Sequence, residues 1–294
     1  MTNKFTLSQF LREYPDDDKC LEKVKTLRWP DLIPCSKCNK PTKHHKVKDR
    51  KAYACQWCGS HVYPLAGTIF DKTSTSLQLW FYAIYLMVQT RAGISAKQLQ
   101  RELGVTYKTA WRMFNQIRKL MSDSGTPLGG EIEVDETFIG GKGKYRKHEW
   151  NNNEKPKEVV MGMLQRKGKV YLRHIPNTGK WTLLKQIQDN VKNDATVYSD
   201  EFGGYYHLYK FGYNHLNVNH NVGQFKNGIA HTNSIENFWS NMKRGITGVY
   251  RHVSPKYLQN YTDEYGWRHN NRLFGGRMFD LLLGEIAEIK LLKT

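Results

Sequence analysis

Four cysteines are the first residues in this chain whose spacing implies a specific chemistry. Cys35 and Cys38 form one C-x2-C pair, and Cys55 and Cys58 form a second pair after sixteen intervening residues. A two-residue gap lets a tight turn direct two thiolates at one ion, and two such turns complete a tetrahedron. Four thiolates leave no open position, so we predict a zinc ribbon that holds one structural Zn²⁺ ion.

The surroundings of these pairs leave two points open. His44, His45 and His61 are potential replacement ligands, although four thiolates leave no vacancy for them. Cys20 stands alone and is expected to be a small core residue. Between residues 35 and 58 there are seven Lys or Arg and one Asp. This basic loop either contacts phosphates or forms a solvated face.

Three carboxylates in the second half of the chain form a second candidate site. Asp135 lies in a strand-like segment, and Asp200 ends the short strand-like segment 195–200; a Gly-Gly pair follows each of them within a few residues. Glu236 lies in "HTNSIENFWSNMK", residues 231–243. Converging carboxylates suit hard cations such as Mg²⁺ or Mn²⁺. Two such ions about 4 Å apart support phosphoryl transfer.

Two further carboxylates lie beside Asp135 and are alternative ligands. Alternation along the strand directs Ile132 and Val134 inward, and it directs Glu133 and Asp135 to the opposite face. Glu136 is the second spare carboxylate, immediately after Asp135.

Segment 231–243 has the residue spacing of an amphipathic helix. At about 100° per residue, one stripe is apolar: Ile235, Phe238, Trp239 and Met242. The adjacent stripe is polar: Asn233, Glu236, Ser240 and Lys243. Many surface helices show such stripes, so this one gains meaning from the two aspartates upstream. We expect Glu236 to be the third metal ligand, with Asn233 as second choice because a neutral amide binds Mg²⁺ less well.

The elements that must position these carboxylates follow a definite order. After the first strand, residues 158–175 predict a hairpin around "RKGK", residues 181–191 a helix, and residues 195–200 a strand. Carboxylates on the first strand, at the end of the fourth and on a later helix are the layout of an RNase H-like nucleotidyl-transferase core. We therefore expect an α/β fold with a mixed five-stranded sheet and flanking helices, in which Asp135 and Asp200 meet.

Residues 94–121 predict two helices joined by a short turn that contains Gly104. The inward positions are expected to be Ile94, Leu99, Leu103, Ala110, Phe114, Ile117 and Met121. This pattern is typical of a helix-turn-helix, whose second helix enters the major groove of DNA. The alternative is an amphipathic helix pair with a solvated basic face. The candidate DNA contacts are Thr106, Tyr107, Lys108, Arg112, Asn115 and Lys119.

The overall charge supports a nucleic-acid partner. The chain of 294 residues carries 45 Lys and Arg against 27 Asp and Glu, a net charge of +18. Such an excess points to a polyanion, although a generically basic protein is the alternative. The longest apolar run, residues 77–88, is too short to span a membrane, and the first residues lack the pattern of a signal peptide. We expect an intracellular protein, in the cytoplasm with the nucleoid of a bacterium or in the nucleus of a eukaryote.

Changes in amino-acid composition and residue pattern along the chain predict its domains. Residues 1–72 are expected to hold the zinc ribbon, and residues 73–122 the helix-turn-helix with its preceding helix. The Gly/Ser/Pro-rich segment 123–130 is expected to be a linker. Residues 131–294 are assigned to the catalytic domain.

Several motifs resemble a known family over residues 20 to 285. They are the two cysteine pairs, "EVDETFIGGK", "VYSDEFGGYY" and the long segment "HTNSIENFWSNMKRGITGVYRHVSPKYLQNYTDEYGWRHNNR". Together they resemble DDE-class insertion-sequence transposases of the Merlin-related, ISXO-like group.

This resemblance implies an activity and a set of site residues. It implies cleavage of transposon 3′ ends at terminal inverted repeats, strand transfer into target DNA, and a dimer or larger assembly on DNA. It assigns metal ligation to Asp135, Asp200 and Glu236, with Lys243 and Arg244 as DNA-contacting residues. A hydrolytic nuclease with the same core, and a DNA-binding regulator without catalysis, are the alternative functions.

Overall fold

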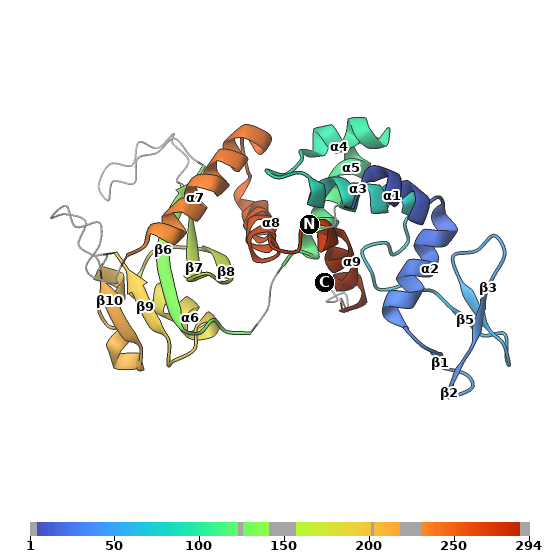
Figure 1. The fold of residues 1–294 in the computed structure, drawn as a ribbon, viewed down its shortest axis with the longest axis horizontal. Helices are drawn as coiled ribbons and strands as arrows, with labels where there is room; N and C mark the ends of the chain where they lie inside the picture. Colours follow the sequence, from blue (N-terminus) through green and yellow to red (C-terminus); the bar gives the residue numbers. More distant parts are fainter. Residues whose placement is uncertain (1–4, 123–125, 141–156, 201–202, 218–230, 289–294) are drawn as a thin grey trace. The chain divides into compact units, whose positions relative to one another are not determined.

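The computed structural model describes residues 5–122, 126–140, 157–200, 203–217 and 231–288. The chain divides into two compact units, each with its own core (Figure 1). The first unit comprises Met1–Leu120 with Leu273–Thr294, and the second comprises Met121–Arg272. Within the described residues, no helix is both long and apolar enough to cross a membrane.

The first unit is built from helices and a ribbon of short strands. Its helices are α1 (Leu7–Glu13), α2 (Asp17–Arg28), α3 (Leu77–Gln89), α4 (Ala96–Leu103), α5 (Tyr107–Lys119) and α9 (Met278–Glu288). Side chains close the N-termini of several of them. Thr6 forms a reciprocal capping box with Gln9 at α1, and Asp16 accepts a hydrogen bond from the amide of Lys19 at α2.

The last described helix, α9, packs into the first unit. Its Phe279 is fully buried, and its ring lies 5.9 Å from Phe10 of α1 and 6.3 Å from Phe81 of α3, measured between centroids. The sequence predicts residues 273–294 to belong to the catalytic domain, whereas the structure groups this segment with residues 1–120. Burial of one aromatic ring among others accounts for the difference.

The cysteine pairs lie in two small antiparallel sheets of the first unit. β1 (Ile33–Cys35) pairs with β2 (Lys40–Thr42). β4 (Tyr53–Cys55) lies between β3 (His44–Lys46) and β5 (His61–Val62). Cys35 and Cys55 are each the last residue of a strand, so both cysteine pairs begin where a strand turns.

The second unit contains a mixed five-stranded sheet, as predicted. Its strands are β6 (Glu131–Ile139), β7 (Glu158–Gln165), β8 (Val170–Ile175), β9 (Thr196–Ser199) and β10 (Asn214–Asn217). Their order across the sheet is β10-β9-β6-β7-β8. The pairs β6/β7 and β7/β8 are antiparallel, whereas β6/β9 and β9/β10 are parallel.

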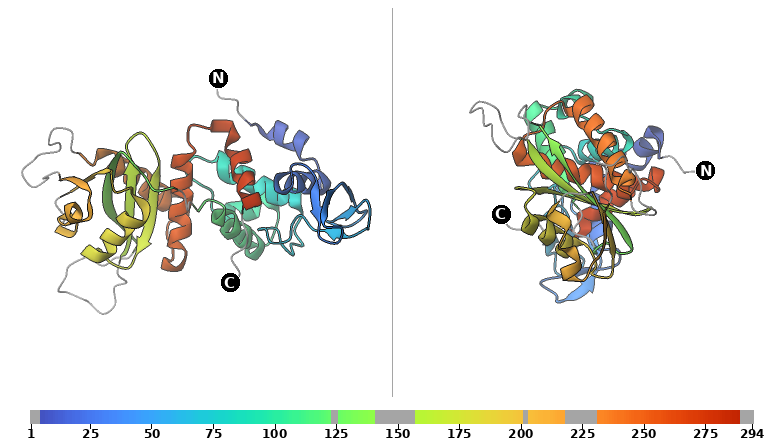
Figure 2. Two further views of the ribbon diagram at one scale, coloured as in Figure 1. Left: turned by 90° about the horizontal axis from the view of Figure 1, so that it is seen from below. Right: turned by 90° about the vertical axis from the view of Figure 1, so that its left-hand side faces the viewer.

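Helices cover both faces of this sheet (Figure 2). α6 (Lys180–Asn190) supplies Leu183 and Ile187 to the main core, together with Ile132, Val134 and other residues of the sheet. On the opposite face, α7 (Asn233–Gly245) contacts β6 and β7. The face that carries Asp135 is therefore covered by a helix.

A third helix, α8 (Leu258–Asn270), covers the outer edge of β8. Gln259 accepts a hydrogen bond from the amide of His174 and donates one to the carbonyl of Leu172, at 2.7 and 3.0 Å. Asn270 makes the same reciprocal pair with the backbone of Val170, at 2.8 and 3.1 Å. These side-chain amides satisfy the backbone groups that an edge strand would otherwise leave free.

The predicted linker is partly integrated into the second unit. Leu128 is buried in the main core. Its amide donates to the carbonyl of Asn190, and its carbonyl accepts from the amide of Lys192, both at 2.8 Å. The described end of this segment, residues 126–130, is therefore part of the folded unit, because a buried leucine and two backbone hydrogen bonds fix it.

Candidate active site and metal centre

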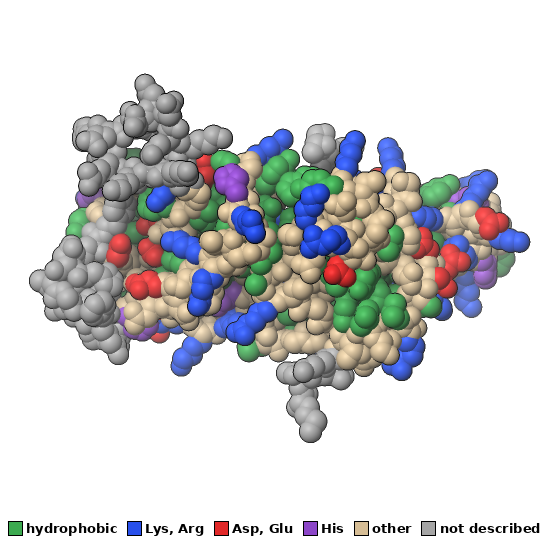
Figure 3. Space-filling model, turned by 90° about the horizontal axis from the view of Figure 1, so that it is seen from above, with side chains coloured by type: hydrophobic (Ala, Val, Ile, Leu, Met, Phe, Trp, Pro, Cys, Tyr) green, Lys and Arg blue, Asp and Glu red, His purple; other side chains and the backbone are tan. Residues whose placement is uncertain are grey.

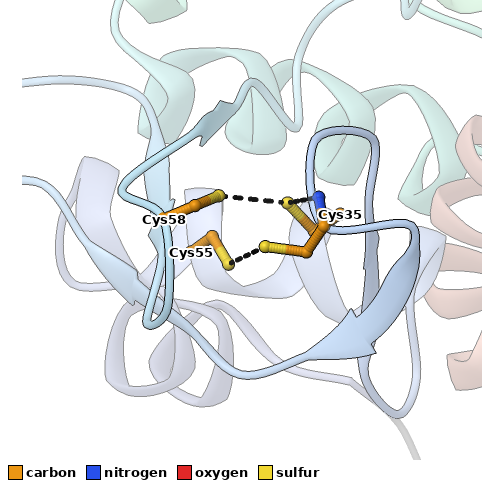
Figure 4. A group of neighbouring side chains, drawn as sticks. Cys35, Cys55 and Cys58 are labelled. Carbon is orange, nitrogen blue, oxygen red and sulfur yellow. Dashed lines mark hydrogen bonds between the residues drawn. The ribbon is translucent and has the colours of Figure 1, made fainter.

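The four predicted zinc ligands converge on one point (Figure 4). The Sγ atoms of Cys35 and Cys58 lie 3.6 Å apart, and those of Cys38 and Cys55 lie 3.9 Å apart. In a regular tetrahedron of Zn–S bonds of about 2.3 Å, sulfur atoms are separated by about 3.8 Å. The four thiols therefore fit a zinc ion.

The two cysteine turns share one backbone geometry. Asn39 follows the first pair with φ +53° and donates its amide to the carbonyl of Cys35 at 2.8 Å. Gly59 follows the second pair with φ +69° and donates to the carbonyl of Cys55 at 3.0 Å. Asn and Gly are the residues that adopt this left-handed conformation most readily. The local sequence thus shapes both turns in the same way.

Local hydrogen bonds favour the metal-binding form of two ligands. The Thr42 hydroxyl, 3.2 Å from the Cys55 sulfur, lowers the pKa of that thiol to about 5. The amide of Cys38 lowers the pKa of Cys35 in the same sense. The pKa of Cys38 rises to about 12 in the absence of metal, mainly because the Cys38 thiol is hydrogen-bonded to Cys58. The ligands would release protons when zinc binds.

The nearby histidines lie outside this group. Within the part of the chain that the structure describes, the metal-ligating cluster contains the cysteines alone. The Nδ1 atom of His44 instead lies 3.0 Å from the carbonyl of Thr42. Cys20 is fully buried, in agreement with its expected role as a core residue.

The predicted pair of aspartates occupies adjacent strands. β6 and β9 run parallel, with Glu131 opposite Thr196 and Glu133 opposite Tyr198. Asp200 follows β9 directly. The same register, continued by two residues, places Asp135 opposite Asp200. The strand adjacency that we predicted between these sites is therefore confirmed.

The Asp135 carboxyl lies in a field of like charge. Burial and the Asp200 carboxylate raise the pKa of Asp135 to about 7, and Glu236 acts in the same direction. Hydrogen bonds from the amide of Glu136, at 2.8 Å, and the indole of Trp239, at 3.0 Å, oppose the rise. Repulsion between carboxylates is what a bound divalent cation relieves. Among the described residues, however, these three carboxylates are not drawn together as tightly as the four cysteines.

The helix that carries Glu236 is anchored as its apolar stripe predicted. Its four apolar side chains are buried: Ile235, Phe238, Trp239 and Met242. Ile235 and Trp239 lie over Gly162 of β7, where a Cβ atom would approach the Trp239 ring to 2.6 Å. Because Gly162 lies opposite Asp135 in the β6/β7 register, this contact brings the Trp239 indole to the Asp135 carboxylate.

The alternative third ligands both lie in the first turn of α7. Asn233 is the first residue of the helix, and Asn233 and Glu236 are both exposed. The Thr232 hydroxyl donates to Glu236 Oε1 at 2.7 Å, so one oxygen of that carboxylate is already oriented. The choice of Glu236 over Asn233 stays a prediction.

Glu133 lies on the same face of β6 as Asp135, as strand alternation predicted, but it is bound to other groups. Its side chain points toward α7 and is fully buried. It accepts hydrogen bonds from the amides of Ser234 and Ile235, at 2.9 and 3.0 Å, and from the Ser234 hydroxyl at 3.0 Å. Arg166 donates to it at 2.9 Å. Glu133 is therefore committed to the N-terminus of α7.

Glu136 points to the other face of β6. The hydroxyl of the buried Tyr205 donates to its carboxyl group. Burial is the main cause that raises the pKa of Glu136 to about 8. Strand alternation separates it from Asp135, so the two spare carboxylates beside Asp135 are both held by other partners.

Comparisons with known proteins give this arrangement a family. Residues 127–270 match the ISXO2-like transposase domain, and residues 15–61 match a transposase zinc-ribbon domain. A transposase-like protein of Haemophilus influenzae is 34% identical over 105 residues, covering 36% of this chain and 84% of that protein. The chain belongs to the ISXO2-like transposase family.

A second relative extends the similarity over most of the chain. A protein in transposable element ISH50 of Halobacterium salinarum is 23% identical over 267 residues, covering 85% of this chain and 90% of that protein. In the present chain, the residues that match the transposase domain include Asp135, Asp200 and Glu236, and those that match the zinc ribbon include all four cysteines.

The predicted DNA-binding helices of the transposase are present as two helices and a tight turn. α4 ends at Gly104, which has φ +64°, and Thr106 caps α5 by accepting a hydrogen bond from the amide of Thr109 at 3.2 Å. All seven apolar positions predicted to point inward are buried. Both helices contact α3, the preceding helix.

The candidate contact residues on and just before α5 differ in their exposure. Thr106, Tyr107, Lys108 and Lys119 are exposed. Arg112 is also exposed, but it donates to the Thr73 hydroxyl at 3.3 Å and lies 5.5 Å from the Trp80 ring. Asn115 is half-buried and donates to the carbonyl of Trp111 at 3.0 Å. DNA contact by these residues stays a prediction.

The basic residues at the end of α7 are exposed, as a DNA contact requires. Lys243 and Arg244 lie in its last turn, about two turns from Glu236. Arg244 donates to Asn241 within the helix at 2.8 Å. His231, two residues before α7, has its Nδ1 atom 3.3 Å from a Glu133 oxygen.

Three functional candidates were missed from the sequence. They are the carboxylate that caps α7, its arginine partner and the indole that binds Asp135: Glu133, Arg166 and Trp239. Glu133 was considered only as a spare ligand, and Trp239 only as an apolar anchor. Arg166 lies in a basic turn that gave no signal, since turns are commonly basic. A fully buried polar atom needs a partner, but burial was not visible in the sequence.

Proposed function

We propose that this chain is a Mg²⁺-dependent DDE transposase that cleaves the 3′ ends of its element and joins them to target DNA. The observation that carries the proposal is the parallel pairing of β6, which carries Asp135 and is covered by α7, with β9, which Asp200 follows directly. The strand order β10-β9-β6-β7-β8, with two parallel pairs followed by two antiparallel pairs, supports an RNase H-like fold for this unit. Regions of net positive charge support a DNA substrate.

Lys and Arg side chains are spread over both units on the face that Figure 3 presents, with fewer acidic groups among them. This distribution matches the net charge of +18. α5 would read the terminal inverted repeats, and Lys243 and Arg244 would contact phosphates next to the carboxylates. The zinc ion would hold the ribbon in a fixed shape and take no part in the chemistry.

The residues of the second unit have distinct roles in this proposal. Asp135 and Asp200 would hold two Mg²⁺ or Mn²⁺ ions, and Glu236 would hold one of them. When bound, such ions activate an attacking oxygen and stabilise the leaving one. Trp239 fixes one oxygen of Asp135 through its indole N–H. The scaffold of α7 holds Glu236 and Lys243 on one side of the helix.

Transposases that act on two ends work as assemblies, so we propose a homodimer or larger complex on DNA, associated with the nucleoid of a bacterial host. The partner DNA would be the terminal inverted repeats and then the target duplex.

A strand-transfer assay tests the proposal. The purified chain is incubated with Mg²⁺, a pre-cleaved transposon end and a supercoiled plasmid, and joined products are resolved on a gel. We expect joining by wild type and none by Asp200→Asn, while both proteins retard the labelled end equally in a binding assay. Cleavage without joining would favour the hydrolytic nuclease. Binding without cleavage of the element's own ends would favour the regulator.

A further inference from the structure

α7 lacks the usual cap at its N-terminus. Its N-cap residue, Thr232, makes no side-chain hydrogen bond to the helix backbone. The amides of Ser234 and Ile235 instead donate to the carboxylate of Glu133, which comes from β6 about a hundred residues earlier. The free amides and the dipole of a helix N-terminus both favour an anion there.

A buried carboxylate needs compensation, and Arg166 supplies it. The Arg166 side chain is 13% exposed and that of Glu133 is 0% exposed. The guanidinium donates its Nε–H to Glu133 at 2.9 Å and its remaining groups to Glu131 at 3.3 Å and the carbonyl of His231 at 2.9 Å. Removal of one partner from such a buried pair leaves the other charge without compensation.

The same cluster reaches the strand that ends at Asp200. The Arg166 guanidinium lies 3.9 Å from the ring centroid of Tyr198, and the Tyr198 hydroxyl donates to Glu131 at 2.7 Å. Tyr198 lies on β9, two residues before Asp200. The cluster therefore touches all three elements that carry the proposed ligands: β6, β9 and α7.

We propose that Glu133 and Arg166 are a positioning pair that fixes α7 on the sheet, so that Glu236 faces Asp135 and Asp200. The inference rests on the proposed function, because it assigns a purpose to the position of Glu236. Glu133 lies two residues before Asp135 on β6, and it holds α7 one to two residues before Glu236. A shift of the helix start would move Glu236 and the Trp239 indole together. Groups that orient metal ligands in this way commonly affect metal affinity or activity by about 10–100-fold.

The principal test compares two charge-neutralising substitutions in the full-length protein. Glu133→Gln keeps the shape of the side chain but removes its charge at the helix. Glu131→Gln is the matched control, because Glu131 also binds Arg166 but is 50% exposed, and its described side-chain partners are Arg166 and Tyr198 rather than residues of α7. Two measurements are made on each: Mn²⁺ binding by titration calorimetry without DNA, and the cleavage rate at saturating DNA and Mn²⁺.

We expect Glu133→Gln to weaken Mn²⁺ binding and to reduce the cleavage rate at saturating DNA by about 10–100-fold. We expect Glu131→Gln to stay within about threefold of wild type, as exposed ion pairs contribute little. Far-UV circular dichroism verifies that both variants are folded. Equal behaviour of the two folded variants in both measurements would overturn the inference.

A milder substitution covers the case in which Glu133→Gln does not fold. Ser234→Ala removes one neutral hydrogen bond to Glu133 at 3.0 Å and keeps both backbone ones. A smaller weakening of Mn²⁺ binding is expected, and wild-type binding by this variant would count against the positioning role.

The inference and the proposed function fail in different ways. Wild-type metal binding and cleavage by Glu236→Gln would refute the role of Glu236, and the positioning role with it. If Glu236→Gln is impaired but Glu133→Gln matches Glu131→Gln, only the positioning role is lost.

Discussion

The zinc centre and the carboxylate site differ in how the chain assembles them. All four cysteines lie within 24 residues, on turns that end two short strands. The carboxylates come from positions 135, 200 and 236, and need a sheet register and a docked helix to meet. Local sequence therefore defines the first site, whereas packing across the whole second unit defines the other.

The two sites also differ in what their geometry implies without a metal. The sulfur atoms already lie at separations that suit zinc. The carboxylates are less tightly gathered and raise the pKa of Asp135 through their mutual repulsion. A structural site is thus closed around its ion, whereas a candidate catalytic site keeps room for substrate. Four experiments test this contrast.

Removal of zinc has the largest expected effect. Structural zinc contributes about 10 kcal/mol or more to small domains, so we expect Cys38→Ser or a strong chelator to unfold the ribbon. Elemental analysis should find one zinc ion per chain in the wild-type protein. Hydrogen exchange then measures the protection of residues 33–62, which should be lost when zinc is removed. Protection of β6–β9 should stay unchanged, because these strands belong to the other unit. Loss of protection in both units would contradict a purely local role for the zinc centre.

Substitution of one carboxylate should abolish chemistry without unfolding. Asp135→Asn removes a charge that repels its neighbours, so we expect cleavage to fall by roughly 10³-fold or more and the melting temperature to stay equal or rise. Calorimetry and a cleavage assay measure the two effects. A clear fall in the melting temperature of Asp135→Asn, together with the loss of cleavage, would indicate that the site is structural, like the zinc centre.

A methyl group at Gly162 should disturb the helix that completes the carboxylate site. The added Cβ would approach the Trp239 ring to 2.6 Å and the Ile235 side chain to 2.8 Å. We expect Gly162→Ala to destabilise the second unit by about 1–3 kcal/mol and to reduce cleavage. Gly248→Ala is the control, because its Cβ would meet no atom within 4 Å. Denaturant unfolding compares the two variants, and equal stability would mean that α7 adjusts freely.

The pH dependence of metal binding should separate the two sites most finely. Asp135 must lose its proton to bind a cation, and its pKa is about 7 rather than its ordinary value near 3.9. Affinity for Mg²⁺ should therefore fall by about tenfold per unit as pH drops below 7, and level off above it.

The stability of the metal-free protein depends on pH in the opposite direction to its affinity for Mg²⁺. The folded state keeps the Asp135 proton longer than the unfolded state does, so this group lowers stability as pH rises from about 4 to 7. Melting temperatures with and without Mg²⁺ at pH 5.5 and pH 8 give both effects. Glu136, with a pKa of about 8, also lowers stability as pH rises. The Glu136→Gln variant removes that contribution and should keep the pH dependence of the Mg²⁺ effect, which comes from Asp135. An equal Mg²⁺ effect at both pH values would contradict the role of Asp135.

The same contrast explains what the sequence could predict. The spacing of the cysteines and the apolar stripes of α4, α5 and α7 depend on neighbours within a few residues, and the structure places all of them as expected. The order of strands and helices was enough to predict that β6 and β9 are adjacent. The cysteine turns and the apolar stripes repeat with the period of a turn or a helix, so a single segment contains their signal.

Features that depend on distant partners were missed. Nothing near Glu133 indicates that its partner amides lie about a hundred residues later, and nothing in the turn after β7 indicates the buried environment of Arg166. Trp239 has the right spacing for an anchor, but its indole N–H has a second role at Asp135. The placement of α9 failed for a similar reason, because an apolar helix does not specify which core receives Phe279.

The return of α9 to the first unit has a consequence for synthesis on the ribosome. The first unit contains the earliest residues, yet its aromatic core needs Phe279. The second unit lies between these segments in the chain, so it can close while the first unit still lacks a helix. The strands of the second unit therefore leave the ribosome before α9 does, so α1 and α3 receive the Phe279 ring only after the sheet of the second unit can form.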